Sequence, residues 1–448
     1  MGYTREILSQ QINPNHSELS KYLRLSNLHL HFRMKKLLLS VFSIALAIGM
    51  DAADLKVNVD LSHDLWWNAP ETPTVKFSLA DSLSRANESK IRFFVTPDTD
   101  ENSDIFSEER VINIPKNDSI NLTFTLPISQ PGFYKCFIED DGNVIHRFNI
   151  GYEPTSCISL PDSQPDFDTF WQRALNELAA VDGEYKVVLD KKQSGKKRKA
   201  YDVEMKSWGG ETIRGKLYVP VADGKYPALI YYNGYGAQPW DFDVDGRDDL
   251  IEFVTGVRGQ MYNQPYNTYG DWIRYNLDKP DSYYYKGAFM DAVRFIDFIS
   301  QYEKTDTDRI FAEGGSQGGA LTLAAASLDD RLAAICPYIP FLSDYKDYFK
   351  IVNWPAAPVM EEAKLKGLDD DTLYRNLSYF DIKNLARRIK CPVMMGIGLQ
   401  DPTCPPHTNM SSYNLITSPK RLIIYPTCGH TVDYSDWNPR RDKFLQDK

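Results

Sequence analysis

The five residues from Gly314 to Gly318, Gly-Gly-Ser-Gln-Gly, constrain the fold of this chain more than any other feature. Residues 308–313 before them suit a short buried strand, and residues 320–326 after them form a strong helix-forming run. The pattern predicts a sharp strand-to-helix turn with Ser316 at the bend, because glycines on either side let the two arms pass closely. The Ser316 hydroxyl then projects above the sheet, and the first N–H groups of the helix face charge that develops beside it.

In such an architecture an acid and a histidine follow the serine in that order, each just after a strand. Asp401 lies three residues past the apolar run 391–398, and His430 lies five residues past the run 421–425. His407 is the other histidine that follows the serine. We favour His430, since His407 falls inside the segment expected to form the helix after the Asp401 loop.

The three side chains suit nucleophilic catalysis. A serine hydroxyl becomes a strong nucleophile when a neutral imidazole takes its proton, and a carboxylate on the other ring nitrogen fixes the imidazole tautomer. We therefore predict Ser316 as nucleophile, His430 as base and Asp401 as acid. Taken singly, Asp401 before a proline also suits a turn, and His430 after a glycine suits a surface loop. Three matches in the required order favour the triad.

Residues 1–53 have the pattern of a leader. A basic start at Met34, with two lysines behind it, precedes the apolar stretch 37–50, which is too short to span a bilayer. We predict a signal peptide from about Met34, translation that begins there, and export to the periplasm or the medium. No stable membrane span is expected.

Residues 54–155 alternate polar and apolar side chains in short runs separated by turn formers, which predicts a small all-β, immunoglobulin-like sandwich. Trp66 and Trp67 either bind carbohydrate or pack in the core of the sandwich, and we favour packing. The alternating runs are residues 55–60, 74–79, 90–95, 120–126 and 132–138.

Residues 156–448 alternate strand-like and helix-like stretches, starting with helical spacing at 166–178. This predicts an α/β domain, a mostly parallel sheet with helices on both faces. The 448 residues, 42% apolar, suffice for two such cores. The net charge of −10 and the pI of about 5.3 argue against nucleic acid as a partner.

Six cysteines are too few for a disulfide framework. The loops of Cys404 and Cys428 should lie near each other, which permits a disulfide, although two thiols are favoured. Five aspartates between Asp241 and Asp249 either hold a cation or form a solvated surface loop, and we favour the loop. We expect no metal and no cofactor.

Several motifs together resemble the acetyl xylan esterase and cephalosporin C deacetylase family of α/β-hydrolases. The similarity covers about residues 158–448, and the leader and the predicted sandwich lie outside it. No single motif is decisive, but their order and combination are specific. The matching segments are residues 166–171, 233–236, 258–260, 283–286 with 291–294, 314–319 and 398–406.

The resemblance implies the same triad, Ser316, Asp401 and His430. It also implies an oxyanion hole formed by the backbone N–H groups of Gln317 and Tyr235. The second of these follows an apolar run and so belongs on a loop at the carboxyl end of a strand, which suits that role.

The triplet Arg258, Gly259 and Gln260 matches the family's second signature, and we interpret it as a structural brace for the active-site loops. One departure from the family is Thr431, which stands where a glutamate usually follows the histidine. The family is commonly hexameric, so the resemblance implies a homo-oligomer.

These features predict an exported serine esterase that removes acetyl groups from acetylated oligosaccharides, such as xylan fragments, through an acyl-enzyme. Two alternatives stay open at this stage. One is a serine peptidase or thioesterase on the same fold, because substrate choice depends on the pocket. The other is a non-catalytic carbohydrate-binding protein, motivated by the tryptophan pair and by Thr431.

Overall fold

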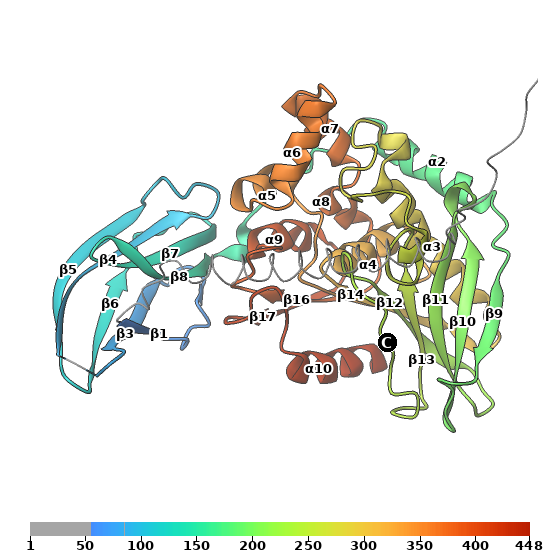
Figure 1. The fold of residues 1–448 in the computed structure, drawn as a ribbon, viewed down its shortest axis with the longest axis horizontal. Helices are drawn as coiled ribbons and strands as arrows, with labels where there is room; N and C mark the ends of the chain where they lie inside the picture. Colours follow the sequence, from blue (N-terminus) through green and yellow to red (C-terminus); the bar gives the residue numbers. More distant parts are fainter. Residues whose placement is uncertain (1–54, 85) are drawn as a thin grey trace, which may run out of the picture.

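The computed structural model describes residues 55–84 and 86–448, so the predicted signal peptide and the start at Met34 lie outside the described residues. Residues 55–152, which we call the N-terminal unit, form two β-sheets with the orders β1-β3-β6 and β2-β8-β7-β4-β5 (Figure 1). The strands are β1 (Leu55–Val59), β2 (Trp66–Trp67), β3 (Thr74–Asp81), β4 (Asn87–Pro97), β5 (Phe106–Ile114), β6 (Ser119–Thr125), β7 (Gly132–Asp140) and β8 (Asn143–Tyr152).

The two sheets of the N-terminal unit bury their apolar faces against each other. The ring of Phe93 on β4 lies 5.6 Å from that of Phe77 on β3 and 4.6 Å from that of Phe124 on β6. Trp67 belongs to the same core and is 3% exposed, and Trp66 packs edge-on against Phe133 at 5.9 Å. The tryptophan pair therefore serves packing, as the sequence favoured.

The rest of the chain contains a nine-stranded sheet, whose strands lie in the order β17-β16-β15-β14-β12-β13-β11-β10-β9. The six strands from β13 to β17 in this order run parallel, and β11, β10 and β9 add an antiparallel edge. The strands are β9 (Lys186–Asp190), β10 (Arg198–Lys206), β11 (Thr212–Pro220), β12 (Tyr226–Tyr232), β13 (Ile251–Gly256), β14 (Thr305–Gly315), β15 (Ala334–Tyr338), β16 (Val393–Gly398) and β17 (Lys420–Tyr425).

Helices cover both faces of this sheet, as the alternation of strands and helices predicted (Figure 1). Leu229 and Tyr231 of β12 pack in the cluster that contains Trp437 of α10, whereas Ile230 and Tyr232 pack in the cluster of α3 and α4. The helices are α2 (Phe167–Ala179), α3 (Tyr284–Gln301), α4 (Gln317–Leu328), α5 (Tyr345–Ile351), α6 (Ala356–Leu365), α7 (Asp370–Ser378), α8 (Ile382–Leu385), α9 (Pro406–Leu415) and α10 (Tyr434–Gln446), with short 3-10 turns at Pro154–Ser156, Trp208–Gly210, Met261–Tyr266, Pro280–Ser282 and Ala386–Arg388.

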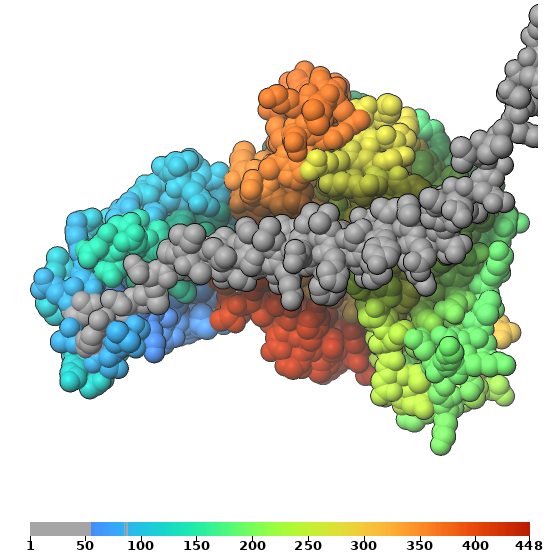
Figure 2. Space-filling model, viewed as in Figure 1, coloured from blue at the N-terminus to red at the C-terminus, as the bar shows by residue number. Residues whose placement is uncertain are grey.

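The N-terminal unit sits at the β17 end of the large sheet, beside α9 and α5 (Figures 1 and 2). Asn149 of β8 exchanges hydrogen bonds with Gln400, and Asp98 pairs with His407 of α9. None of the helices within the described residues is both long enough and apolar enough to cross a bilayer.

Candidate active site

Ser316 lies between β14 and α4, at the turn that the sequence predicted. Its backbone adopts φ 56° and ψ −123°, a conformation with positive φ that L-residues rarely occupy. A Cβ on Gly314 would come within 2.5 Å of the backbone of Gly318, so the strand and the helix touch at this point. The glycines are therefore required by the turn, and the turn exposes the Ser316 side chain at the carboxyl edge of the sheet.

Asp401 and His430 meet on the loops that follow β16 and β17. Nδ1 of His430 lies 2.8 Å from Oδ2 and 3.1 Å from Oδ1 of Asp401. The carboxylate is 1% exposed, and its Oδ1 accepts hydrogen bonds from the backbone N–H groups of Thr403 at 2.8 Å and Cys404 at 2.9 Å. These donors hold the carboxylate in one orientation.

The two loops are joined by backbone contacts as well. The N–H of Gln400 donates to the carbonyl of Cys428 at 2.9 Å, and Leu399 donates to Tyr425 at 3.0 Å. A Cβ on Gly398 would collide with the carbonyl oxygens of this same loop, so the approach requires glycine. Asp401 and His430 are 29 residues apart in the sequence, and the close pairing of their loops brings both side chains to one site.

The Ser316 side chain makes one loose contact. Its Oγ lies 4.0 Å from Sγ of Cys404, and within residues 55–84 and 86–448 it forms no hydrogen bond with His430. Catalytic hydrogen bonds are often long without substrate and tighten when it binds. The His430 side chain is 31% exposed, so one side of the imidazole is open to solvent.

Cys404 is a neighbour of the serine that the sequence did not reveal. Burial raises the pKa of the Cys404 thiol well above its ordinary value, so it is a neutral wall of the site. The predicted proximity of the Cys404 and Cys428 loops is present, and all six cysteines are free thiols, as favoured.

Two backbone N–H groups near the serine are available. In the described part of the chain, no acceptor contacts the N–H of Tyr235 or that of Gln317. Tyr235 follows β12 and Gln317 opens α4, so both donors lie on loops or helix starts at the same edge of the sheet as Ser316. Free donors at this edge suit an oxyanion hole.

Gln260 connects these two segments. Its Oε1 accepts from the N–H of Gly236 at 3.0 Å and from Nδ2 of Asn233 at 3.2 Å. Its side chain also pairs with that of Gln317, whose Oε1 accepts from the hydroxyl of Tyr285 at 3.1 Å. The loop after β12 is thereby tied to the residue that follows the nucleophile.

Arg258 is buried and bridges three parts of the hydrolytic region. Its Nε and Nη2 donate to Asp291 of α3 at 2.9 and 2.7 Å, and Nη2 also donates to the carbonyl of Trp208 at 3.1 Å. Burial lowers the pKa of Arg258, but the charge of Asp291 outweighs burial and raises it. Gly259 has φ +69°, where a side chain would strike Asn267. Such contacts suit a brace.

Aromatic side chains pack around the ring of Tyr235. The Tyr235 ring lies 5.0 Å from that of Trp272 and 5.4 Å from that of Trp354, and Trp354 stacks on Phe341 at 5.8 Å. Sequence patterns did not single out these residues, because they come from loops with no periodicity. Together they form an aromatic cluster, and Phe341 ties it to the serine through its N–H, which donates to the Ser316 carbonyl at 3.1 Å.

The acidic loop from Asp241 to Asp249 is engaged by protein donors. Asp245 accepts from the N–H groups of Lys196 and Lys197, and Asp241 accepts from the Tyr218 hydroxyl at 2.9 Å. These bonds are consistent with the favoured surface-loop interpretation.

Among the described residues, Asp344, Asp347 and His407 have a spacing that would suit a metal. Asp344 pairs with Lys383 at 2.9 Å, and Asp347 pairs with Lys350 at 2.7 Å. His407 lies in α9, as expected, and binds Asp98 through Nδ1. We interpret the group as an ion-pair network.

A serine on a strand-to-helix turn of a mostly parallel sheet, with an Asp–His pair on the loops after two later parallel strands, β16 and β17, defines an α/β-hydrolase. Residues 158–447 match the family model "Acetyl xylan esterase (AXE1)". The chain therefore belongs to the acetyl xylan esterase family and is a carboxylic-ester hydrolase, which confirms the resemblance seen in the sequence.

Individual relatives agree with this assignment. The acetyl esterase Axe7A of Xylanibacter ruminicola is 29% identical over 317 residues, which span 68% of this chain and 72% of that protein. Acetyl xylan esterase 1 from Thermoanaerobacterium sp. JW/SL YS485 is 28% identical, with a TM-score of 0.60 over 66% of this chain and 97% of its own. The acetyl xylan esterase of Paenibacillus sp. R4 is also 28% identical, with a TM-score of 0.61 over 66% and 98%.

Proposed function

We propose that this protein is an exported serine esterase that removes acetyl groups from acetylated carbohydrates such as xylo-oligosaccharides. The observation that carries the proposal is the buried Asp401 carboxylate on Nδ1 of His430, at the edge of the sheet where the turn exposes Ser316. Family membership supports acetyl ester hydrolysis and speaks against the non-catalytic alternative.

In the proposed mechanism, His430 takes the proton of Ser316 as the serine oxygen attacks the acetyl carbonyl. Asp401, on Nδ1 of His430, holds the ring and stabilises the imidazolium. The N–H groups of Tyr235 and Gln317 bind the oxyanion, each contributing about 3 kcal/mol or more of transition-state stabilisation. His430 then gives the proton to the departing sugar oxygen, and water hydrolyses the acetyl-enzyme by the same steps.

A short acyl group suits the surroundings of the serine. Sγ of buried Cys404 lies 4.0 Å from Ser316 Oγ, and buried Phe341 donates its N–H to the Ser316 carbonyl at 3.1 Å, so the space beside the serine is crowded. This crowding favours acetyl esters over the thioesterase or peptidase alternative. The printed names of the relatives, an acetyl esterase and two acetyl xylan esterases, support the same choice.

The remaining parts of the proposal concern the architecture around the hydrolase. We assign residues 1–53 to a leader with a signal peptide from about Met34, residues 54–155 to an immunoglobulin-like sandwich and residues 156–448 to the catalytic domain. The two facing sheets of the N-terminal unit support the sandwich assignment. A homo-oligomer stays a prediction.

The proposal is tested by replacing Ser316 with Ala. We expect Ser316→Ala to lose release of p-nitrophenol from its acetate and of acetate from acetylated xylo-oligosaccharides, whereas Ser327→Ala on the same helix should retain both. Full activity of Ser316→Ala would contradict the assignment of the nucleophile. Faster turnover of long acyl esters or peptide amides than of acetyl esters would instead contradict the substrate class.

A further inference from the structure

A cleft of about 530 Å³ lies between the N-terminal unit and the loop that carries Asp401. Strands β7 and β8 form one wall, and the loop from Gln400 to Pro406 forms another. The third wall is the end of α5 with residues 351–353. The N-terminal unit thus contributes directly to a cavity that borders the proposed triad.

The β7–β8 wall combines aromatic and hydrogen-bonding side chains. Phe137 is opposite Arg147, and Lys135 is opposite Asn149 in the antiparallel register, so these four side chains share one face of the sheet. It is the face that points away from the core of the N-terminal unit, because the alternate residues of β7 are those buried in that core. The Phe137 ring is also stacked on Phe94 at 4.7 Å, which fixes its position.

Arg147 is the uncommitted donor of this wall. Lys135 is already paired with Glu101, and Asn149 with Gln400, whereas the exposed Arg147 side chain forms no hydrogen bond or ion pair within the described part of the chain. A guanidinium offers five N–H donors in a fixed plane. A sugar presents hydroxyl oxygens around its rim and C–H groups on the face of its ring. Hydrogen-bond donors beside an aromatic ring therefore match both parts of a sugar.

The cleft leads toward the reacting groups. Pro402 and Pro405, in the wall formed by the loop from Gln400 to Pro406, flank Cys404. Sγ of Cys404 lies 4.0 Å from Ser316 Oγ. On the opposite wall, Asn353 precedes Trp354, and the Trp354 ring contacts that of Tyr235 at 5.4 Å. A group held in the cleft therefore lies next to the loop that carries Asp401 and Cys404.

Polar contacts on both sides keep the cleft walls in place. Asn149 donates through its N–H to Oε1 of Gln400 at 2.7 Å and through Nδ2 to the carbonyl of Leu399 at 2.9 Å. On the other side, His407 bridges Asp98 at 3.0 Å and Asp347 of α5 at 3.5 Å.

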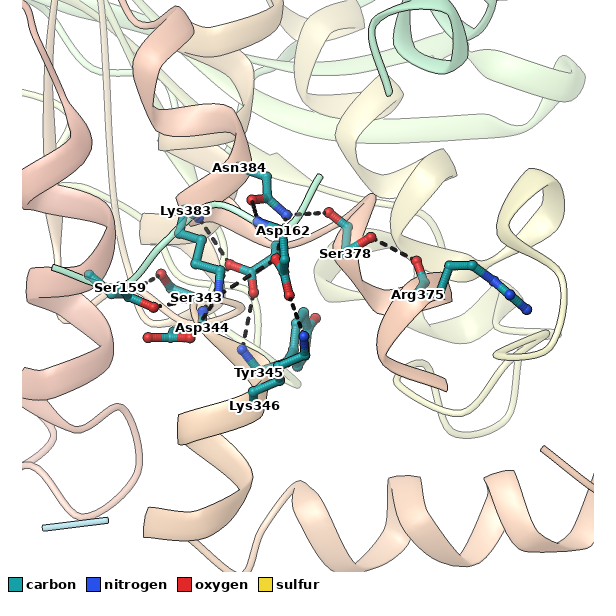
Figure 3. A network of polar contacts seen from close by, with 12 residues as sticks. Ser159, Asp162, Ser343, Asp344, Tyr345, Lys346, Arg375, Ser378, Lys383 and Asn384 are labelled. Atoms are coloured by element: carbon teal, nitrogen blue, oxygen red, sulfur yellow. Dashed lines mark hydrogen bonds and ion pairs between the residues drawn. The ribbon is translucent and has the colours of Figure 1, made fainter. Parts of the chain in front are cut away.

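The start of α5 is anchored by a buried network (Figure 3). Asp381 accepts from the N–H groups of Asp344 and Tyr345 at 2.8 and 3.0 Å, and Lys383 pairs with Asp344 and with Asp162 of the segment that follows the N-terminal unit. The wall formed by the end of α5 is thus fixed to both parts of the molecule. A preorganised cleft loses little entropy when a ligand binds.

We propose that this cleft binds the saccharide portion of the substrate, with Arg147 and Phe137 of the N-terminal unit as specificity-determining residues. The inference rests on the proposed function, since the cleft would hold the sugar whose acetyl group reaches Ser316. The N-terminal unit then acts as part of the substrate site and favours oligosaccharides over small acetyl esters.

The test compares two substrates in the full-length protein. Arg147→Ala should lower kcat/KM for acetylated xylo-oligosaccharides about 10-fold or more, mainly through KM, because a charged hydrogen bond is lost. Its kcat/KM for p-nitrophenyl acetate should stay within about 2-fold of the parent, since that ester has no sugar to bind. Arg147→Lys should recover part of the loss, and Arg387→Ala, an exposed arginine elsewhere, should change neither value.

A binding measurement separates this inference from the proposed function. Calorimetric titration of Ser316→Ala with deacetylated xylo-oligosaccharide should detect binding that weakens about 10-fold when Arg147→Ala is added. Equal binding with and without Arg147, or an equal fall on both ester substrates, would overturn the inference even if Ser316 proves to be the nucleophile. Turnover that persists in Ser316→Ala would overturn the proposed function alone.

Discussion

Gln260 and Gln317 form a reciprocal side-chain pair: Nε2 of each lies 3.0 Å from Oε1 of the other. One belongs to the family's second signature triplet and the other follows the proposed nucleophile. Because Oε1 of Gln260 also accepts from the N–H of Gly236 at 3.0 Å, this pair sets the spacing between the two proposed oxyanion donors. This contact supports our prediction that the triplet acts as a brace, through positioning.

Replacing Gln260 with Ala should loosen the loop after β12 without touching substrate. We expect kcat to fall roughly 10- to 100-fold with KM nearly unchanged, because a small misplacement of catalytic donors costs transition-state binding. Steady-state kinetics on p-nitrophenyl acetate measure this split. Gln446→Ala, at the exposed end of α10, is the matched control and should behave like the parent. A rise in KM alone would argue for direct substrate contact.

Asp401→Asn should retain the fold but remove the charge that orients His430. An amide on Nδ1 favours the wrong imidazole tautomer, so kcat should fall about 10⁴-fold. The variant should unfold at nearly the same urea concentration as the parent, because an amide oxygen still accepts from Thr403 and Cys404. Activity within about 10-fold of the parent would show that another acid serves His430.

His407 predicts a pH-dependent stability of the contact between the N-terminal unit and α9. Burial by itself lowers the pKa of His407, but the charge of Asp98 and the hydrogen bonds that the ring donates to Asp347 and Asp98 outweigh it and place the pKa well above its ordinary value. A raised histidine pKa stabilises the fold fully below the unfolded value of about 6.5, and the gain is lost as pH rises through the folded value.

Urea unfolding from about pH 6 to about pH 10 checks this sign. At the acidic end, His407→Gln should be less stable than the parent by about 3 to 5 kcal/mol, because a buried ion pair is broken. The gap should narrow as the pH rises. A gap that widens with pH would mean that His407 is neutral in the folded protein.

Local sequence signals located the catalytic elements well. The turn at Ser316 and the loops of Asp401 and His430 each depend on a few neighbouring residues, glycines at close approaches and apolar runs before them, so their placement could be predicted. The helix at 166–178 was likewise expected and is present as α2. His407 was assigned to a helix for the same reason and lies there.

Long-range contacts were not accessible in the same way. Strands β5 and β8 carry charged residues between their apolar ones, so the sequence pattern did not predict these two strands. The antiparallel edge of the large sheet depends on pairing between distant segments. Asn149 and Gln400 are 251 residues apart, so no pattern along the chain indicates their contact. The thiol of Cys404 was expected near Cys428, yet its side chain turns toward Ser316.

The central claim is that Ser316 carries the acetyl group during turnover. Rapid quenching of the reaction with an acetyl ester, followed by proteolysis and mass spectrometry, should detect one acetyl group on the peptide that contains Ser316. In Asp401→Asn, the acetyl adduct should form or accumulate at a rate that differs from that in the parent. Ser316→Ala should show no adduct. An acetyl group on a different residue, or steady turnover in Ser316→Ala with no adduct, would contradict the account.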